Sequence, residues 1–334
     1  MADTQSLQGV VAVGASAGGV EALIQFSSGL RANLPFAVLV ALHIPAEAPS
    51  VLAQIIDRSG PLPAMSARHG EALEPGLIYV AVPDRHLLVA DSRVVLSEGP
   101  TENTYRPAIN ALFRSVALDF GPRAICVLMS GVLDDGVLGA RAIRSRGGTT
   151  IVQHPDDALY KSMPLNAIRA GVVDHRVAAK DVGALLESLA NREIEDQEME
   201  PDDLMKLENR IAMGPRFGTP FDSEELGPPS GYTCPDCNGS LMEISKDNYR
   251  CRVGHAWTAD ALLTARDDEV EGALWVALRS LQEKAKLARR MAENVGSGVL
   301  FDRYTTQADE AERALTILGK RLSEAASDRG ELID

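Results

Sequence analysis

Aromatic side chains are scarce in this sequence, at 4% of 334 residues. Proteins that hold single-stranded nucleic acid stack its bases on exposed rings, so this scarcity speaks against such a platform. Positive charge is in the minority as well, with 33 Lys and Arg against 47 Asp and Glu and a formal net charge of −14. A field of that sign repels phosphate backbones and anionic lipid, so nucleic acid is not expected as a partner.

Long apolar runs are missing, and we expect no secretory leader. No apolar stretch approaches the roughly 20 residues that a membrane-spanning helix requires. The N-terminal residues MADTQSLQG lack the basic start and apolar stretch of a signal peptide. We therefore predict a cytoplasmic protein with no membrane insertion.

Cysteine is rare, with four residues in the chain. Cys126 lies in the apolar run AICVLM and is expected to be an inert, buried thiol. The other three, Cys234, Cys237 and Cys251, lie close together. In a cytoplasmic chain, such a cluster indicates a metal site rather than disulfides.

The sequence is rich in short apolar runs that alternate with helical patterns over residues 1–190. Buried strands are expected at 9–15, 36–42, 124–130 and 149–153, and helices at 18–30, 50–59, 106–120, 137–146 and 181–190. Shorter extended pieces at 86–90 and 93–97 predict a hairpin that turns at Asp91 and Ser92. Apolar strands alternating with helices predict a three-layer α/β domain with a doubly wound, mostly parallel sheet.

The remaining chain divides into three parts. Residues 191–230 are dense in acid and then in Pro and Gly, which predicts a linker, with a short helix at 202–212 compatible with its pattern. Residues 231–258 form a small Cys/His unit, and residues 259–334 carry two amphipathic patterns on either side of NVGSG. We expect the two patterns to form a helical hairpin whose apolar stripes pack on each other. Binding of a signalling partner, or self-association, is the second hypothesis for these helices.

Ser16 lies in the segment VVAVGASAGGVEAL, where a strand runs through a glycine-rich turn into a helix. Such a turn either cradles a nucleotide phosphate or exposes a nucleophilic serine beside free amides. The pattern G-A-S-A-G-G is not G-x-G-x-x-G, and no Gly-Lys-Ser/Thr follows. The spacing of the glycines therefore favours a nucleophilic serine, but it does not exclude a nucleotide-phosphate site.

A nucleophilic serine requires a base, and the base requires a carboxylate. His43 directly follows the strand 36–42, and carboxyl ends of neighbouring parallel strands share one edge of a sheet. The histidines at 69, 86, 154 and 175 lie in turns or strand starts, where a surface position is expected. Asp134 and Asp135 follow strand 124–130 at the same edge, and either is also a candidate N-cap for the helix at 137–146.

Six segments, taken in order, resemble the catalytic domain of the CheB-type chemotaxis protein-glutamate methylesterases. They are VGASAGGVEAL, HIP, HGEALEPGLIYVAVPDRHL, YRPAINALFRSVA, SGVLDDG and SMPLNAIRAGVVD, and the resemblance covers roughly residues 9–190. It implies a catalytic triad of Ser16, His43 and Asp135, with oxyanion donors in the Ser16 turn and in the loop before Asp135. It also implies that no catalytic cofactor is needed.

The resemblance implies hydrolysis of methyl esters on glutamyl side chains of chemoreceptor-type proteins, with release of methanol, and deamidation of glutamine. Two features depart from the family pattern. Val132–Leu133 replaces a common Met-Gly, which bears on the shape of the loop and on its oxyanion donor. The catalytic segment begins near residue 9, so we expect no receiver domain ahead of it.

Cys234, Cys237, Cys251 and His255 follow the pattern C-x2-C and C-x3-H. Three thiolates and an imidazole are a preferred tetrahedral ligand set for zinc. Four protein ligands close the site, so the expected zinc is structural, within a zinc-ribbon-like module. The alternative function is a catalytically weak signalling or scaffold protein that acts through this module and the helices after it.

Overall fold

The computed structural model describes residues 6–47, 50–192, 194, 202–215 and 226–331, with side chains as far as Leu322. The chain divides into two compact units, Met1–Leu262 and Leu263–Asp334. The expected linker at 191–230 falls partly on 193, 195–201 and 216–225, which lie outside the described residues. The described part of that stretch contains the helix α7 (Asp203–Met213), at the place where the sequence allowed one.

A seven-stranded sheet in the order β3-β4-β2-β1-β7-β8-β9 forms the centre of the first unit. All of its pairings are parallel. The strands are β1 (Gly9–Ala15), β2 (Phe36–Leu42), β3 (Ala64–Ser66), β4 (Ile78–Val80), β7 (Ala124–Leu128), β8 (Thr149–Gln153) and β9 (His175–Val177). The prediction of a doubly wound parallel sheet is confirmed. The strand order reverses at β1, which places the end of β1 at the topological switch point where such sheets build their sites.

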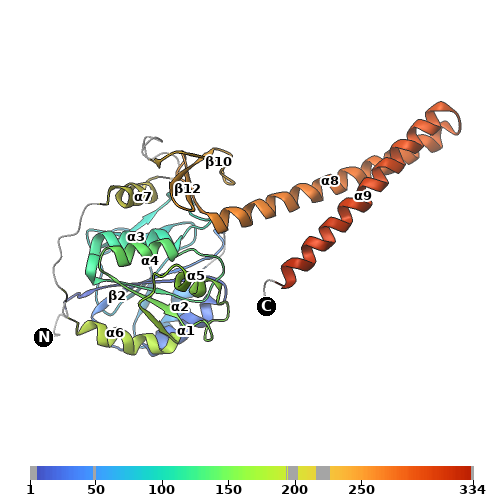
Figure 1. Ribbon diagram of the computed structural model, residues 1–334. Helices are drawn as coiled ribbons and strands as arrows, with labels where there is room; N and C mark the ends of the chain where they lie inside the picture. Colours follow the sequence, from blue (N-terminus) through green and yellow to red (C-terminus); the bar gives the residue numbers. More distant parts are fainter. Residues whose placement is uncertain (1–5, 48–49, 193, 195–201, 216–225, 332–334) are drawn as a thin grey trace. The chain divides into compact units, whose positions relative to one another are not determined.

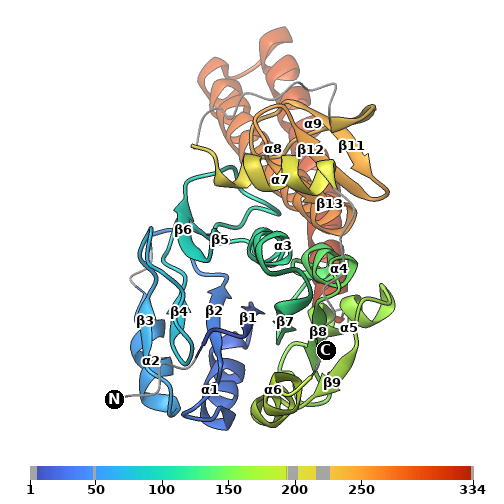
Figure 2. The ribbon, with the colours of Figure 1, turned by 90° about the vertical axis from the view of Figure 1, so that its left-hand side faces the viewer.

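Helices cover both faces of this sheet, as Figure 2 shows. One face carries α1 (Gly19–Gly29), α2 (Leu52–Ser59) and α6 (Val182–Ala190), and the other carries α3 (Ile109–Phe120), α4 (Val137–Ser145) and α5 (Ser162–Arg169). The strands β1 and β2 are buried along their whole length because both of their faces are covered. The ends of these rigid strands can therefore hold side chains in fixed positions.

A separate antiparallel hairpin, β5 (His86–Ala90) with β6 (Arg93–Ser97), packs beside α3. Asp91 and Ser92 form its turn with φ of 52° and 56°, as a two-residue turn of this kind requires. The predicted hairpin is confirmed. Ala212 of α7 packs with Leu88 of β5 and with Ala108, just before α3, so α7 is part of the body of this unit.

The Cys/His segment forms a second sheet within the same unit. Its strands β10 (Pro229–Thr233), β11 (Ser240–Ser245), β12 (Asn248–Cys251) and β13 (Ala256–Thr258) are antiparallel and consecutive. Met242 packs with Leu207 and Ile211 of α7, which joins this small sheet to the body of the unit.

The second unit is a helical hairpin made of α8 (Ala259–Val295), beyond its first turn, and α9 (Val299–Glu331), as predicted (Figure 1). The turn contains Gly296 and Gly298, with φ of 70° and 100°. Close to it the two helices bury small side chains, at Ala285, Ala288, Ala292, Ala308 and Ala311. Within the described part of the chain, no helix is both long enough and apolar enough to cross a membrane.

Candidate active site

Ser16 lies immediately after β1, in the turn that leads into α1. Its amide donates to the carbonyl of Ser130 (2.9 Å), and its own carbonyl accepts from Gly19 (2.8 Å). Gly18 has a φ of 67°, a conformation that a residue without Cβ adopts at little cost. The turn is thus held at both ends while the Ser16 side chain stays partly exposed.

His43 follows β2 directly, and its amide extends the parallel ladder by donating to the carbonyl of Ala15 (3.2 Å). This bond places the imidazole beside Ser16, with 3.1 Å between His43 Nδ1 and Ser16 Oγ. The other ring nitrogen, Nε2, lies 2.7 Å from Asp135 Oδ2. A carboxylate accepts, so Nε2 carries the proton and Nδ1 is free to accept from the serine hydroxyl.

Asp135 is held by the start of α3 as well as by His43. Its carboxylate accepts from the amides of Ile109 (2.7 Å) and Asn110 (3.0 Å), the first two residues of that helix. The side chain is thus anchored at the N-terminal end of α3, where free amides are available to donate to it. The side chains of His43 and Asp135 are only 4% and 2% exposed, so bulk water hardly competes with their contact.

Neither aspartate caps α4, and that alternative from the sequence is wrong. The side-chain oxygen of Asn110 accepts from the amides of Gly136 (2.9 Å) and Gly139 (2.8 Å) at the start of α4. Asp134 lies beside Asp135 but points elsewhere: its Oδ1 accepts from the hydroxyl of Thr258 (2.8 Å). Burial raises the pKa of Asp134 to about 6, and the nearby charges of Asp260 and Asp135 add to the rise.

Tyr105 is a site residue that the sequence reasoning did not single out. Its ring stacks on the His43 imidazole, with centroids 3.6 Å apart and planes 6° from parallel. Burial raises the pKa of Tyr105, and the charge of Asp135 raises it further. The stacked ring restricts rotation of the imidazole. The only signal in the sequence was its place at the head of YRPAINALFRSVA.

The loop between β7 and Asp135 comes very close to the Ser16 turn. A Cβ on Gly131 would lie 3.0 Å from Ser16 Cβ and 2.5 Å from Met163 Cε, so only glycine allows this approach. Leu133 has a φ of 60°, the left-handed conformation that glycine favours. The side chain of Asn166 donates to its carbonyl (2.9 Å). The loop therefore keeps a glycine-like turn at Leu133.

A hollow of about 450 Å³ opens beside the imidazole. Its lining includes His43, Pro45, Asp84, Thr101, Tyr105 and Arg106. Arg106 is paired with Asp84 (2.6 Å), so the charge on this wall is largely balanced. The hollow can therefore hold a neutral side chain next to the imidazole of His43.

The remaining histidines do not join this group, and one expectation about them is wrong. His86 is fully buried, where a surface position was expected, because it connects two backbone segments. Its Nε2 contacts the carbonyl of Pro100 (2.9 Å) and its Nδ1 accepts from the amide of Ala108 (3.3 Å). Burial lowers the pKa of His86, as its structural position suggests. Cys126 is buried as expected, and burial raises the pKa of its thiol.

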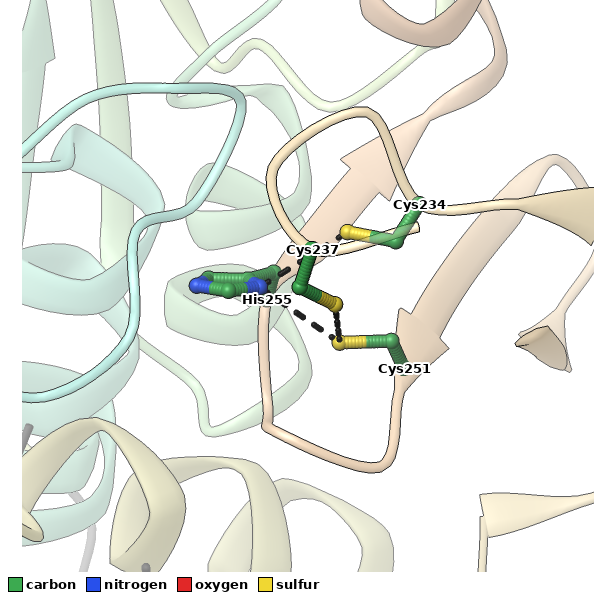
Figure 3. A group of neighbouring side chains, drawn as sticks. All are labelled: Cys234, Cys237, Cys251 and His255. Carbon is green, nitrogen blue, oxygen red and sulfur yellow. Dashed lines mark hydrogen bonds between the residues drawn. The ribbon is translucent and has the colours of Figure 1, made fainter. Parts of the chain in front are cut away.

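A second cluster brings together the four predicted metal ligands (Figure 3). Their ligand atoms all lie within 4.8 Å of one another. Cys237 Sγ lies 3.7 Å from Cys251 Sγ, and His255 Nδ1 lies 3.6 Å from Cys234 Sγ and 3.5 Å from Cys251 Sγ. Tetrahedral zinc with bonds of about 2.3 Å to sulfur and about 2.0–2.1 Å to nitrogen gives edges of about 3.8 and 3.5–3.6 Å. The residues present therefore fit a tetrahedral zinc ion.

Comparisons with known proteins point to one family. A protein-glutamate methylesterase/protein-glutamine glutaminase (number 4) of Myxococcus xanthus (strain DK1622) is 37% identical over 181 residues, 54% of this chain and 51% of that protein. Its counterpart in Moorella thermoacetica (strain ATCC 39073 / JCM 9320) is 34% identical over 185 residues, 54% of this chain and 44% of that protein. The chain spans about half the length of the curated relatives it matches.

The fold agrees with these relatives. The crystal structure of the Thermotoga maritima CheB methylesterase catalytic domain superposes with a TM-score of 0.52 and 28% sequence identity, over 54% of this chain and 98% of that one. The family model described as CheB methylesterase matches residues 11–186, more than half of the 334 residues. The chain belongs to the CheB methylesterase family.

Proposed function

We propose that this protein is a serine hydrolase that removes methyl esters from glutamyl side chains of methylated chemoreceptor-type proteins, in chemotaxis-like signalling. The observation that supports it most directly is the hydrogen-bonded series Ser16, His43, Asp135 at the carboxyl edge of the sheet. The names of its relatives, protein-glutamate methylesterase/protein-glutamine glutaminase, supply the substrate class.

Acylation begins at Ser16. Its hydroxyl oxygen attacks the ester carbonyl while His43 Nδ1 accepts the hydroxyl proton, and Asp135 stabilises the imidazolium that forms. The negative charge on the carbonyl oxygen requires amide donors. The amides of Ser16 and Gly131 already donate to carbonyls, so we assign this role to the amide of Ala17, the residue after the nucleophile. The imidazolium then protonates the departing methoxide, and methanol leaves.

Deacylation repeats the same proton path with water. His43 accepts a proton from water, the resulting hydroxide attacks the acyl-serine, and Ser16 recovers its proton as the glutamate carboxylate forms. With a glutamine side chain in place of the ester, the departing group is ammonia and the product is the same glutamate. The balanced charge of the hollow beside His43 suits either neutral side chain.

The Cys/His cluster has a separate, structural role in the proposed function. Cys234, Cys237, Cys251 and His255 would hold a structural zinc ion, because four protein ligands leave no position for a substrate. Bound zinc supplies cross-linking between β10–β13 and no hydrolytic chemistry. The cluster lies outside the serine, histidine and aspartate series, so hydrolysis as proposed needs no cofactor.

We assign the segments as a catalytic part at 1–190, a linker at 191–230, a metal module at 231–258 and a helical hairpin at 259–334. We propose that the helical hairpin binds a signalling partner or a second copy of this chain. Exposed apolar side chains on α8 support this, at Val270, Trp275 and Val276. Reduced thiol ligands suit a cytoplasmic location.

The function is tested by methanol release from a methylated receptor fragment. We expect release by the full chain and a loss of about 10³- to 10⁶-fold in kcat for Ser16→Ala. Ser28→Ala is the matched control, because its hydroxyl contacts only a helical carbonyl on the exposed side of α1 (2.8 Å). If the wild-type chain released no methanol from several receptor fragments, the alternative of a catalytically weak scaffold protein would replace this proposal.

A further inference from the structure

The metal module touches the segment that forms one wall of the active site. Thr101 donates its hydroxyl to Asp236 (2.8 Å), which lies between the ligands Cys234 and Cys237. The carbonyl of Thr101 accepts from the amide of Ala256 (3.1 Å), the residue after the ligand His255. Both metal-binding turns therefore contact one residue of this segment.

The contact continues along β13. The amide of Asn103 donates to the carbonyl of Ala256 (2.8 Å), and the side chain of Asn103 accepts from the amide of Thr258 (2.9 Å). Glu102 and Tyr105 close a tight turn with two backbone hydrogen bonds of 3.2 and 2.9 Å. The ring of Tyr105, at the end of this turn, is the one that stacks on His43.

A network of buried charges also holds the turn formed by Glu102 and Tyr105. Glu102 is 2% exposed and is paired with Arg114 of α3 (2.5 Å) and with Arg250 of β12 (3.1 Å). Arg250 also donates to the carbonyl of Gly254 (2.7 Å), inside the turn between the ligands Cys251 and His255. Removing one partner of such a buried network leaves an uncompensated charge, so the module and the turn hold each other in place.

A second connection reaches the other side of the triad. The hydroxyl of Thr258, the last residue of β13, donates to Asp134 (2.8 Å), the neighbour of Asp135. A displacement of β13 would therefore act on both partners of the imidazole, through Tyr105 on one side and through the Asp134–Asp135 loop on the other.

We propose that the Cys/His module is a support for the hydrolase site, with Thr258 and Ala256 as positioning residues for Tyr105, His43 and Asp135. Metal binding fixes the turns around Cys234–Cys237 and Cys251–His255, and these turns fix β13. The inference rests on the proposed function, and it assigns the module a role within hydrolysis instead of a separate binding role.

The test changes Thr258 in the full chain and follows the triad with two probes. Thr258→Val removes the hydroxyl and keeps the shape, Thr258→Ser restores the hydroxyl, and Thr306→Val is the matched control on the hairpin, where the hydroxyl contacts only a helical carbonyl. One probe is the rate at which a fluorophosphonate labels Ser16. The other is the NMR signal of the His43 ring nitrogens, assigned with His43→Gln.

We expect Thr258→Val to slow labelling by about tenfold to a hundredfold, as misplacement of reacting groups by about 1 Å does. We expect it also to shift the His43 signals, and to lower kcat for ester hydrolysis with KM unchanged. Thr258→Ser and Thr306→Val should match the wild type. Removal of the metal with a chelator should shift the His43 signals in the same direction as Thr258→Val.

A folded Thr258→Val protein with the wild-type labelling rate and unmoved His43 signals would overturn the inference and leave the proposed function intact. A wild-type chain that resists labelling, while Thr258→Val still shifts His43, would instead count against the proposed function and keep the structural coupling. If Thr258→Val does not fold, Asp236→Ala replaces it, because Asp236 is exposed and its contact with Thr101 is a single hydrogen bond.

Discussion

The triad and the Cys/His cluster are both groups of converging side chains, but their positions are determined differently. Ser16 and His43 follow strands that are buried along their whole length, so the packing of a large apolar core fixes them. Cys234 and Cys251 come from a sheet of four short strands whose core has few apolar side chains, such as Leu241 and Trp257. We expect a small sheet of this kind to depend on a bound metal for its stability.

The difference predicts which changes separate chemistry from folding. A substitution that removes a polar atom of Ser16, His43 or Asp135 should leave the main sheet folded. Within the cluster, the side chains proposed to bind metal are also the ones expected to stabilise the small sheet.

Asp135→Asn is expected to lower kcat by about 10⁴-fold, because an amide no longer selects the imidazole tautomer that leaves Nδ1 free. The chain should still unfold cooperatively, since the sheet is unchanged. Methanol release and thermal melting measure the two effects. Asp156→Asn is the matched control: it changes an exposed His–Asp pair, His154 with Asp156, and should alter neither quantity. Equal loss of activity and of folding would contradict the contrast.

Cys237→Ser is expected to abolish the proposed binding of one zinc ion per chain and to open β10–β13 at the same time, since free energy of binding is free energy of folding in such sites. Zinc content by mass spectrometry of the intact chain and amide hydrogen exchange report the two events. Cys126→Ala, which removes a thiol from the main sheet, should keep one zinc per chain. A zinc-free Cys237→Ser protein with protected strands would show that the small sheet is stable without its ligand.

Glu102 lies where the Cys/His module contacts the catalytic part. We expect its ionisation to make the free energy of unfolding depend on pH. Burial opposes its ionisation, but Arg114 and Arg250 outweigh burial and lower the pKa from 4.5 to about 2. This shift stabilises the fold by on the order of 3 kcal/mol above pH 4.5, and the contribution disappears as the pH falls toward 2. The difference in stability between wild type and Glu102→Gln should therefore be constant near neutral pH and shrink in acid. A difference that grows in acid would contradict the ion-pair network.

We expect substitutions of Leu133 to have the smallest effect on stability and on the rate of hydrolysis. A left-handed conformation costs about 1–2 kcal/mol at a residue with a side chain and more at a β-branched one. Leu133→Ile should therefore lower the melting temperature and slow hydrolysis, whereas Leu133→Gly should keep the rate. A Leu133→Ile protein as active as the wild type would mean that this turn does not position Asp135.

The strands and helices around the site were predictable because their patterns are strong. GVVAVGA and FAVLVAL are apolar throughout, and both strands have the predicted bounds. The edge strands β3 and β9 were not predicted, because three residues such as His175–Val177 carry no pattern that distinguishes them from a loop. The helix α5 was not predicted either, since Pro164 near its start obscures the helical pattern.

At the site, the sequence indicated that Ser16 and His43 share one sheet edge, which requires only the order of the strands. The choice between Asp134 and Asp135 required the resemblance to a family, because both follow the same strand and spacing alone cannot choose between them. The contacts made by Tyr105, Asn110 and Thr258 could not be predicted from the sequence. Each depends on a contact between segments far apart in sequence, and no local pattern encodes such a contact.

The packing of α7 has a practical consequence for protein engineering. A shortened chain that ends at residue 190 contains Ser16, His43 and Asp135, yet it lacks the helix that covers Leu88 and Ala108. It also lacks Arg250, one of the two arginines that pair with Glu102. Such a fragment would expose apolar surface and a poorly balanced buried charge, the two features that promote aggregation. The compact unit extends to Leu262, so we expect that a transplant of the methylesterase-family domain into another protein should carry the Cys/His module with it.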